Sequence, residues 1–178
     1  MYLCETTDII MNVQNTVEII PFSPDLKEHI KTLNIEWLQK YFRVEDKDEL
    51  VLSNPQEEII DKGGMIFYAK FNDEILGTVS LMKLNEDTFE LSKMAVSDKA
   101  QGLGIGNKLL IHSIAVAEEN NIKKLLLYSN RILLPVLHLY EKFGFIEWSE
   151  KIANLIPEEH STVTIELLAD GKRNLELV

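Results

Sequence analysis

The pattern of apolar and polar residues in the middle of this chain predicts three consecutive β-strands. These segments are rich in β-branched and aromatic residues, and two short polar clusters, Asn72-Asp73 and Asn85-Glu86-Asp87, separate them. Connections this short join antiparallel neighbours. The strands are expected over residues 65–71, 74–84 and 88–96, with further strands over 16–22, 145–149 and 161–169.

Apolar residues at helical spacing predict helices around these strands. The first helix begins with a clear start signal, because Ser23 can cap it and Pro24 fits the first helical position. Its buried face is expected to carry four apolar residues at helical spacing, Leu26, Ile30, Leu33 and Trp37. The other helices are expected from residue 54 to before Gly63, for about 15 residues after Gly106, and over 134–143.

The segment 123–129 is a continuous apolar run, which is typical of a strand covered on both faces. Together with the strand at 88–96 and the helix between them, it predicts a βαβ unit. The expected fold class is therefore α/β. It consists of a mixed, mostly antiparallel twisted sheet of about seven strands, flanked by helices and containing that one parallel unit.

Composition and charge narrow the classes of function. The 178 residues fit one domain, and a net charge of −11 argues against non-specific nucleic-acid binding, which needs a basic face. The single cysteine, Cys4, leaves no internal disulfide, and a cytoplasmic location is expected. No apolar run approaches the roughly 18 residues of a membrane span, so no membrane partner is expected. No metal-ligand spacing is present, and no metal is expected.

Three alternating glycines lie between the strand at 88–96 and the next helix, in Gln101-Gly102-Leu103-Gly104-Ile105-Gly106. Two phosphate-binding patterns fail here. No Gly-Lys-Ser/Thr stands at Walker spacing, and the third glycine is out of register for a dinucleotide fingerprint. The pattern that fits is Q/R-x-x-G-x-G/A, in which N–H groups at a helix N-terminus point at a pyrophosphate. Taken alone, the hexapeptide is equally compatible with a glycine-rich turn that binds nothing.

A second block, Leu139-Tyr140-Glu141-Lys142-Phe143-Gly144-Phe145, follows about 35 residues after the glycines. With both motifs in this order on a strand–helix–strand pattern, the chain resembles the GNAT superfamily of acyl-CoA-dependent N-acyltransferases. The resemblance covers residues 16–169 as one GNAT N-acetyltransferase domain. An N-terminal arm (1–15) and a C-terminal tail (170–178) lie outside it.

The resemblance implies an enzyme that moves an acetyl group from acetyl-CoA to a primary amine by direct attack in a ternary complex. Acetyl-CoA is then a co-substrate, with its pyrophosphate on the turn amides and its pantetheine arm along the end of the preceding strand. The residues implied in cofactor binding are Met94, Ala95, Val96, Gln101, Gly102, Leu103, Gly104, Ile105, Gly106, Asn130 and Tyr140. For Asn130, an ordinary turn residue ahead of a helix is the alternative.

Two residues carry the implied proton chemistry. Tyr140 is the implied acid for the departing thiolate, because a phenol with a pKa of about 10 stays protonated at neutral pH. It also fits the apolar stripe of its own helix. Glu90 is the implied base, acting through water, and a solvated strand glutamate is the alternative. A bulge in this strand, which is usual in the family, would change which residues share a face with Glu90.

The acceptor stays open among a small amine, an amino acid, an antibiotic and a protein. The aromatic and acidic stretch 37–49 could line a cationic site, although such charge runs are more often solvated surface. Assembly as a homodimer is also open. The alternative function is a non-catalytic acyl-CoA-binding sensor or interaction module with the GNAT fold.

Overall fold

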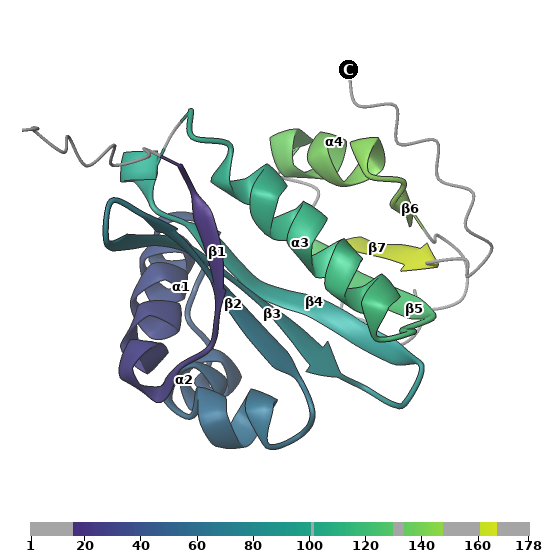
Figure 1. Cartoon of the computed structure of the whole chain (residues 1–178), viewed down its shortest axis with the longest axis horizontal. Coiled ribbons are helices and arrows are strands. Elements are labelled where there is room, and N and C mark those ends of the chain that lie inside the picture. Colours follow the sequence, from purple (N-terminus) through teal and green to yellow (C-terminus); the bar gives the residue numbers. More distant parts are fainter. Residues whose placement is uncertain (1–15, 101, 130–133, 148–160, 167–178) are drawn as a thin grey trace, which may run out of the picture.

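The computed structural model describes residues 16–100, 102–129, 134–147 and 161–166 (Figure 1). In this part of the chain, seven strands form one sheet in the order β1-β2-β3-β4-β5-β7-β6. Only β4 and β5 pair in parallel, and the other neighbours are antiparallel, so the predicted mixed sheet is confirmed. The strands are β1 (Glu18–Pro21), β2 (Met65–Phe71), β3 (Glu74–Lys83), β4 (Thr88–Val96), β5 (Lys124–Ser129), β6 (Ile146–Glu147) and β7 (Ser161–Glu166).

Helices cover both faces of the sheet (Figure 1). They are α1 (Lys27–Tyr41), α2 (Asp46–Ser53), α3 (Ile105–Glu119) and α4 (Leu134–Lys142). Ile30 of α1 and Leu52 of α2 share one buried apolar cluster with Tyr68 of β2. Leu109 of α3 shares a second cluster, on the opposite face, with Val79 of β3. Burial of these two layers stabilises the domain.

The first helix starts where the sequence predicts it, but the Ser23 side chain does not cap it. A short 3-10 turn, Pro24–Leu26, leads directly into α1, and Ser23 precedes it in an extended conformation. The Leu26 N–H donates to the Ser23 carbonyl at 2.9 Å, and the Ser23 side chain makes no cap hydrogen bond. Ile30 and Leu33 are buried as expected, whereas Leu26 and Trp37 are only half-buried against the same cluster.

The second predicted helix, from residue 54 to before Gly63, is present as a short helical segment of π type, Gln56–Ile60. Sequence reasoning missed the helix before it, α2, which ends at Ser53. The sequence gives no clear signal for α2, because the first turn of this helix is acidic and only two of its residues, Val51 and Leu52, are buried. Two adjacent apolar positions are too few to show a helical period.

Among the described residues, the prediction that β5 is covered on both faces is wrong. Leu125 and Leu127 are buried in the cluster beneath α3. Leu126 is half-buried, and the Tyr128 side chain on the same face is 40% exposed. Helix α1 packs on β3 and β4, and no described helix packs closely on this second face of β5.

No helix among the described residues is long and apolar enough to cross a bilayer.

Candidate functional site

Strand β4 changes its surroundings halfway along its length. From Thr88 to Leu91 it pairs with β3 on one side and with β5 on the other. At Ala95 and Val96 the pairing with β3 continues, and no β5 partner follows within the described part of the chain. We call residues 88–91 the paired half of β4 and residues 94–96 its free half. Within the described residues, the backbone groups that the free half directs away from β3 have no strand partner, as at the edge of a sheet.

A β-bulge at Lys93 separates the two halves. Thr78 and Ser80 are two residues apart on β3, whereas their partners on β4, Ala95 and Ser92, are three residues apart. The extra residue is Lys93. Its φ of +50° is a backbone conformation that lysine rarely adopts. Holding a side-chain-bearing residue there costs about 1–3 kcal/mol. The surrounding structure must therefore stabilise it.

The bulge also decides which side chains share a face with Glu90. Because of the extra residue, Glu90 lies on the face that carries Ala95, whose side chain packs in the cluster beneath α1 and α2. Met94 and Val96 pack instead against the cluster beneath α3. The change of parity that the sequence analysis allowed for is present.

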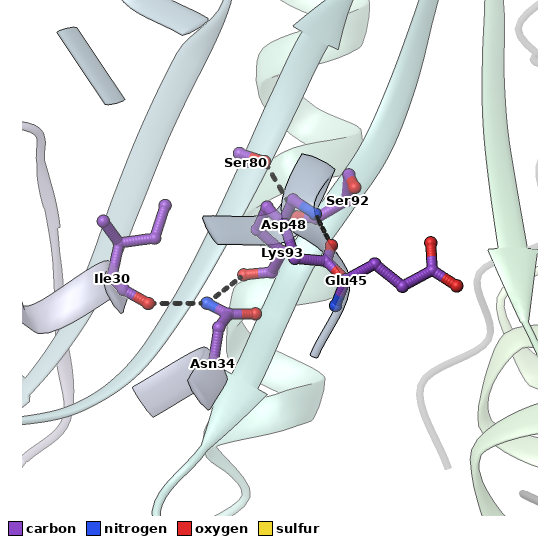
Figure 2. A network of polar contacts seen from close by, with 7 residues as sticks. All are labelled: Ile30, Asn34, Glu45, Asp48, Ser80, Ser92 and Lys93. Atoms are coloured by element: carbon purple, nitrogen blue, oxygen red, sulfur yellow. Dashed lines mark hydrogen bonds and ion pairs between the residues drawn. The ribbon is translucent and has the colours of Figure 1, made fainter. Parts of the chain in front are cut away.

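Side chains from three elements meet at the bulge (Figure 2). The Asn34 side-chain amide of α1 donates to the Lys93 carbonyl at 3.2 Å. The Lys93 ammonium forms an ion pair with Asp48 of α2, with 2.6 Å between Nζ and Oδ1. On β3, the Ser80 hydroxyl donates to the Ser92 carbonyl at 2.9 Å. Helices α1 and α2 therefore both contact the point where β4 leaves β5.

The glycine turn ahead of α3 is open on its outer side. Gly102 and Gly104 have φ values of +82° and +65°, in the region that favours glycine. A Cβ at either position would meet no described atom within 4 Å. The Lys108 N–H donates to the Gly104 carbonyl at 3.1 Å, so the amides of residues 105–107 precede the first bond of the helix. Such amides, aided by the helix dipole, suit an anion.

The glycine turn and the free half of β4 lie close together because α3 approaches the sheet closely. A Cβ on Gly77, which pairs with Val96, would lie 2.6 Å from Cγ2 of Ile105. Only glycine allows that approach. At the start of α3, the Met94 Cε lies 3.6 Å from the position that a Cβ on Gly106 would take. The open turn and the open strand edge are therefore adjacent.

Comparison with known proteins identifies this arrangement. Residues 31–145 match the acetyltransferase (GNAT) family. The chain belongs to this family. The resemblance inferred from the two motifs is confirmed.

Three GNAT relatives show how far the similarity extends. The N-acetyltransferase YvbK of Bacillus subtilis (strain 168) is 28% identical over 120 residues, covering 64% of this chain and 77% of its own. A GNAT acetyltransferase from Staphylococcus aureus Mu50 shares the fold, with a TM-score of 0.74 and 23% identity. The match covers 85% of this chain and 99% of that protein. A GNAT acetyltransferase from Elizabethkingia anophelis, solved with acetyl-CoA bound, gives a TM-score of 0.55 and 26% identity. The match covers 86% of this chain and 100% of that protein.

Tyr140 of this GNAT chain lies in α4, and its side chain is 5% exposed. Its ring centroid is 5.3 Å from that of Phe145, and both residues belong to the cluster beneath α3. Burial raises the pKa of Tyr140 to about 12. The residue thus has the apolar surroundings that its helical spacing predicts, and its catalytic role stays a prediction.

Glu90 and Tyr128 lie on the same face of β4 and β5, opposite α3. Glu90 pairs with Leu126 in the parallel ladder, and Tyr128 lies two residues further along the same face of β5. The pKa of Tyr128 is raised by partial burial and by the negative charge of Glu90. Sequence reasoning missed Tyr128, because its run of apolar residues suggested a strand covered on both faces.

The acidic stretch is mostly exposed, as the sequence analysis expected, and Glu49 pairs with Lys31 at 2.5 Å on the surface. Asp48 is the exception, because it is half-buried and held against Lys93. No sequence pattern marks Asp48 among its acidic neighbours. Two implied cofactor residues, Gln101 and Asn130, lie outside the described residues. Within the described ranges, no group of His, Cys, Asp and Glu side chains could hold a metal ion.

Proposed function

We propose that this GNAT protein is an N-acetyltransferase that moves the acetyl group of acetyl-CoA to a primary amine by direct attack in a ternary complex. The observation that carries the proposal is the free half of β4 beside the open glycine turn. A strand edge with available backbone groups suits an extended amide-containing arm, and helix N-terminal amides suit a pyrophosphate. The Elizabethkingia anophelis relative, solved with acetyl-CoA bound, supports this choice of cofactor.

The proposed cofactor site follows these two features. The amides of residues 101–106 are proposed to hold the pyrophosphate, and the backbone of residues 94–96 is proposed to pair with the pantetheine arm. Asn130 and Tyr140 are proposed as further contacts. Open space at Gly102 and Gly104 is consistent with close approach of a phosphate to the backbone. We take residues 16–169 as the catalytic domain.

Bound acetyl-CoA supplies a thioester, whose carbonyl carbon forms a bond to the amine nitrogen while its C–S bond breaks. The protein then has three tasks: removing a proton from the acceptor ammonium, stabilising the carbonyl oxygen and stabilising the sulfur. We propose that the N–H of Met94 or Ala95 hydrogen-bonds to the oxygen. Holding both substrates side by side supplies much of the acceleration.

Tyr140 is proposed to act on the sulfur. Its pKa of about 12 lies well above the value of about 8.5 typical of a thiol. Complete proton transfer from this phenol to the departing thiolate is therefore unfavourable. We expect Tyr140 to act chiefly as a hydrogen-bond donor that stabilises the negative charge developing on sulfur.

Glu90 is proposed to receive the proton of the amine through water. It is half-buried and pairs with Leu126 of β5, on the face of the sheet opposite α3. Tyr128 borders it, and the charge of Glu90 helps to keep that phenol protonated. We propose that Tyr128 helps to orient the water or the amine at this carboxylate.

The test combines binding with turnover. We expect titration calorimetry of the full chain with acetyl-CoA to give a Kd below about 1 mM, the upper range of common substrate constants. A panel of polyamines, amino acids, aminoglycosides and peptides should then release free thiol from acetyl-CoA with one class well above background. Absence of acetyl-CoA binding would overturn the proposal. Binding without turnover on any amine would favour the non-catalytic sensor.

A further inference from the structure

The carbonyl of the bulge residue Lys93 is bound by a buried side chain from a distant part of the chain. The Asn34 amide nitrogen donates to this carbonyl at 3.2 Å and to the Ile30 carbonyl of its own helix at 2.8 Å. Both partners are carbonyl oxygens, which only accept, so the NH₂ end of the amide must face them. Asn34 is 4% exposed, and its amide would lose hydrogen bonds if the bulge moved away.

The side chain of Lys93 is held from a second helix. Its ion pair with Asp48 leaves the two side chains 16% and 21% exposed, the least exposed ion pair among the described residues. Asp48 lies in the first turn of α2, where the helix dipole favours a carboxylate. Because the pair is shielded from water, losing one partner should cost more than at an exposed pair.

The two helices that hold Lys93 are also joined to each other. The Lys31 ammonium of α1 contacts both Glu49 and Ser53 of α2, at 2.5 Å and 3.0 Å. Helix α1 therefore holds the bulge carbonyl, α2 holds the bulge side chain, and Lys31 links α1 to α2. This double attachment fixes the strained residue from which the free half of β4 starts (Figure 2).

We propose that Asn34, Asp48 and Lys93 form a latch that sets the position of the free half of β4 and thereby its fit to the pantetheine arm of acetyl-CoA. They are positioning residues that act through the backbone of residues 94–96. The identity of the ligand rests on the proposed function. The effect of the latch on the strand itself does not.

The test compares two probes that differ by the arm. Acetyl-CoA carries pantetheine, whereas 3′-phospho-ADP is the nucleotide end of CoA and can reach only the glycine turn. In Asp48→Asn and in Asn34→Leu, we expect the Kd for acetyl-CoA to rise about fivefold, as for one lost hydrogen bond. The Kd for 3′-phospho-ADP should stay within about twofold of the parent value. Amide hydrogen exchange of residues 93–96 in the free protein should become faster.

Two matched controls remove a similar bond elsewhere. Glu86→Gln breaks an exposed ion pair with Lys83, 2.7 Å long, at the far end of β3. Ser113→Ala removes a buried hydrogen bond of 2.8 Å to the Leu109 carbonyl within α3. Neither contacts the bulge, so neither should change the ratio of the two dissociation constants or the exchange at 93–96. A charge exchange, Asp48→Lys with Lys93→Asp, should regain part of the affinity lost in Asp48→Lys alone.

Each result decides the matter in one direction. Selective loss of acetyl-CoA affinity with faster exchange at 93–96 supports the latch. Unchanged affinity and exchange in both variants overturn it, as does an equal loss for both probes, which would indicate damage to the whole fold. If the parent protein bound no acetyl-CoA, the proposed function would fail. Exchange at residues 93–96 would then still decide whether Asn34 and Asp48 hold the strand.

Discussion

The two halves of β4 belong to one strand and differ in what they can bind. In the paired half, Phe89 and Leu91 are buried and the ladder continues on both sides. The free half is wholly apolar, with Met94, Ala95 and Val96, and has a strand partner on one side within the described chain. What separates them is one extra residue, Lys93. A strand can thus lose its neighbour inside a sheet when a single bulge interrupts the ladder and helices hold it in place.

Deleting Lys93 should remove the difference between the halves. Without it, Ser92 and Ala95 would oppose Ser80 and Thr78 in regular register, so β4 could run straight beside β5. We expect acetyl-CoA affinity to fall by more than about a hundredfold, because several hydrogen bonds to the arm are lost together. Calorimetry measures the loss, and binding of 3′-phospho-ADP together with a cooperative urea transition shows that the domain still folds. Near-parental acetyl-CoA affinity would contradict the role given to the free half.

Replacing Tyr140 by Phe should separate chemistry from binding at the free half. Tyr140 belongs to the apolar cluster against which Met94 and Val96 pack, and Phe preserves its ring. We expect kcat to fall about ten- to a hundredfold, as for one hydrogen bond to a charged group, with the Kd for acetyl-CoA within about twofold. Steady-state kinetics with the best amine from the panel, alongside calorimetry, checks both numbers. Full activity in this variant would remove Tyr140 from the mechanism.

Replacing Gly77 by Ala should disturb the contact between the free half and α3. The new Cβ would lie 2.6 Å from Ile105 Cγ2 and 3.1 Å from Leu109 Cδ1, so α3 must shift. We expect the free energy of unfolding to fall by about 1–3 kcal/mol, as for other overpacked cores. Urea unfolding gives the value, and Gly106→Ala, where the nearest atom is 3.6 Å away, is the control for a lost glycine. Equal stability of the Gly77→Ala variant and the parent would show that this approach is not close.

The smallest expected effect is a difference in alkaline stability between the tyrosines beside the two halves. Burial raises the pKa of Tyr140 to about 12, so the folded state keeps a proton that the unfolded state loses near pH 10. Stability should therefore fall as pH rises from about 10 to about 12. The pKa of the more exposed Tyr128 is raised too, and solvent weakens its contribution. Between pH 9 and about 11.5, the urea midpoint should fall less with rising pH in Tyr140→Phe than in Tyr128→Phe. The reverse order would contradict the burial given to Tyr140.

Much of the sheet could be predicted because its signals are local. Strand β2 was predicted residue for residue, since Asn72 and Asp73 adopt the positive φ values of a tight turn between two apolar runs. The latch gave no such signal. Asn34 and Lys93 are 59 residues apart, and their contact depends on how α1 crosses the sheet. The open face at Tyr128 was missed for a similar reason, because an apolar run does not reveal where a covering helix ends.

Amide chemical shifts during titration with acetyl-CoA offer the sharpest single check on where the cofactor lies. We expect the largest shifts at residues 94–96 and at residues 102–106, with little change along the paired half at 88–91. Addition of 3′-phospho-ADP should shift the second group alone. Shifts confined to other surfaces, or the same response to both ligands at 94–96, would show that the free half of β4 does not receive the pantetheine arm.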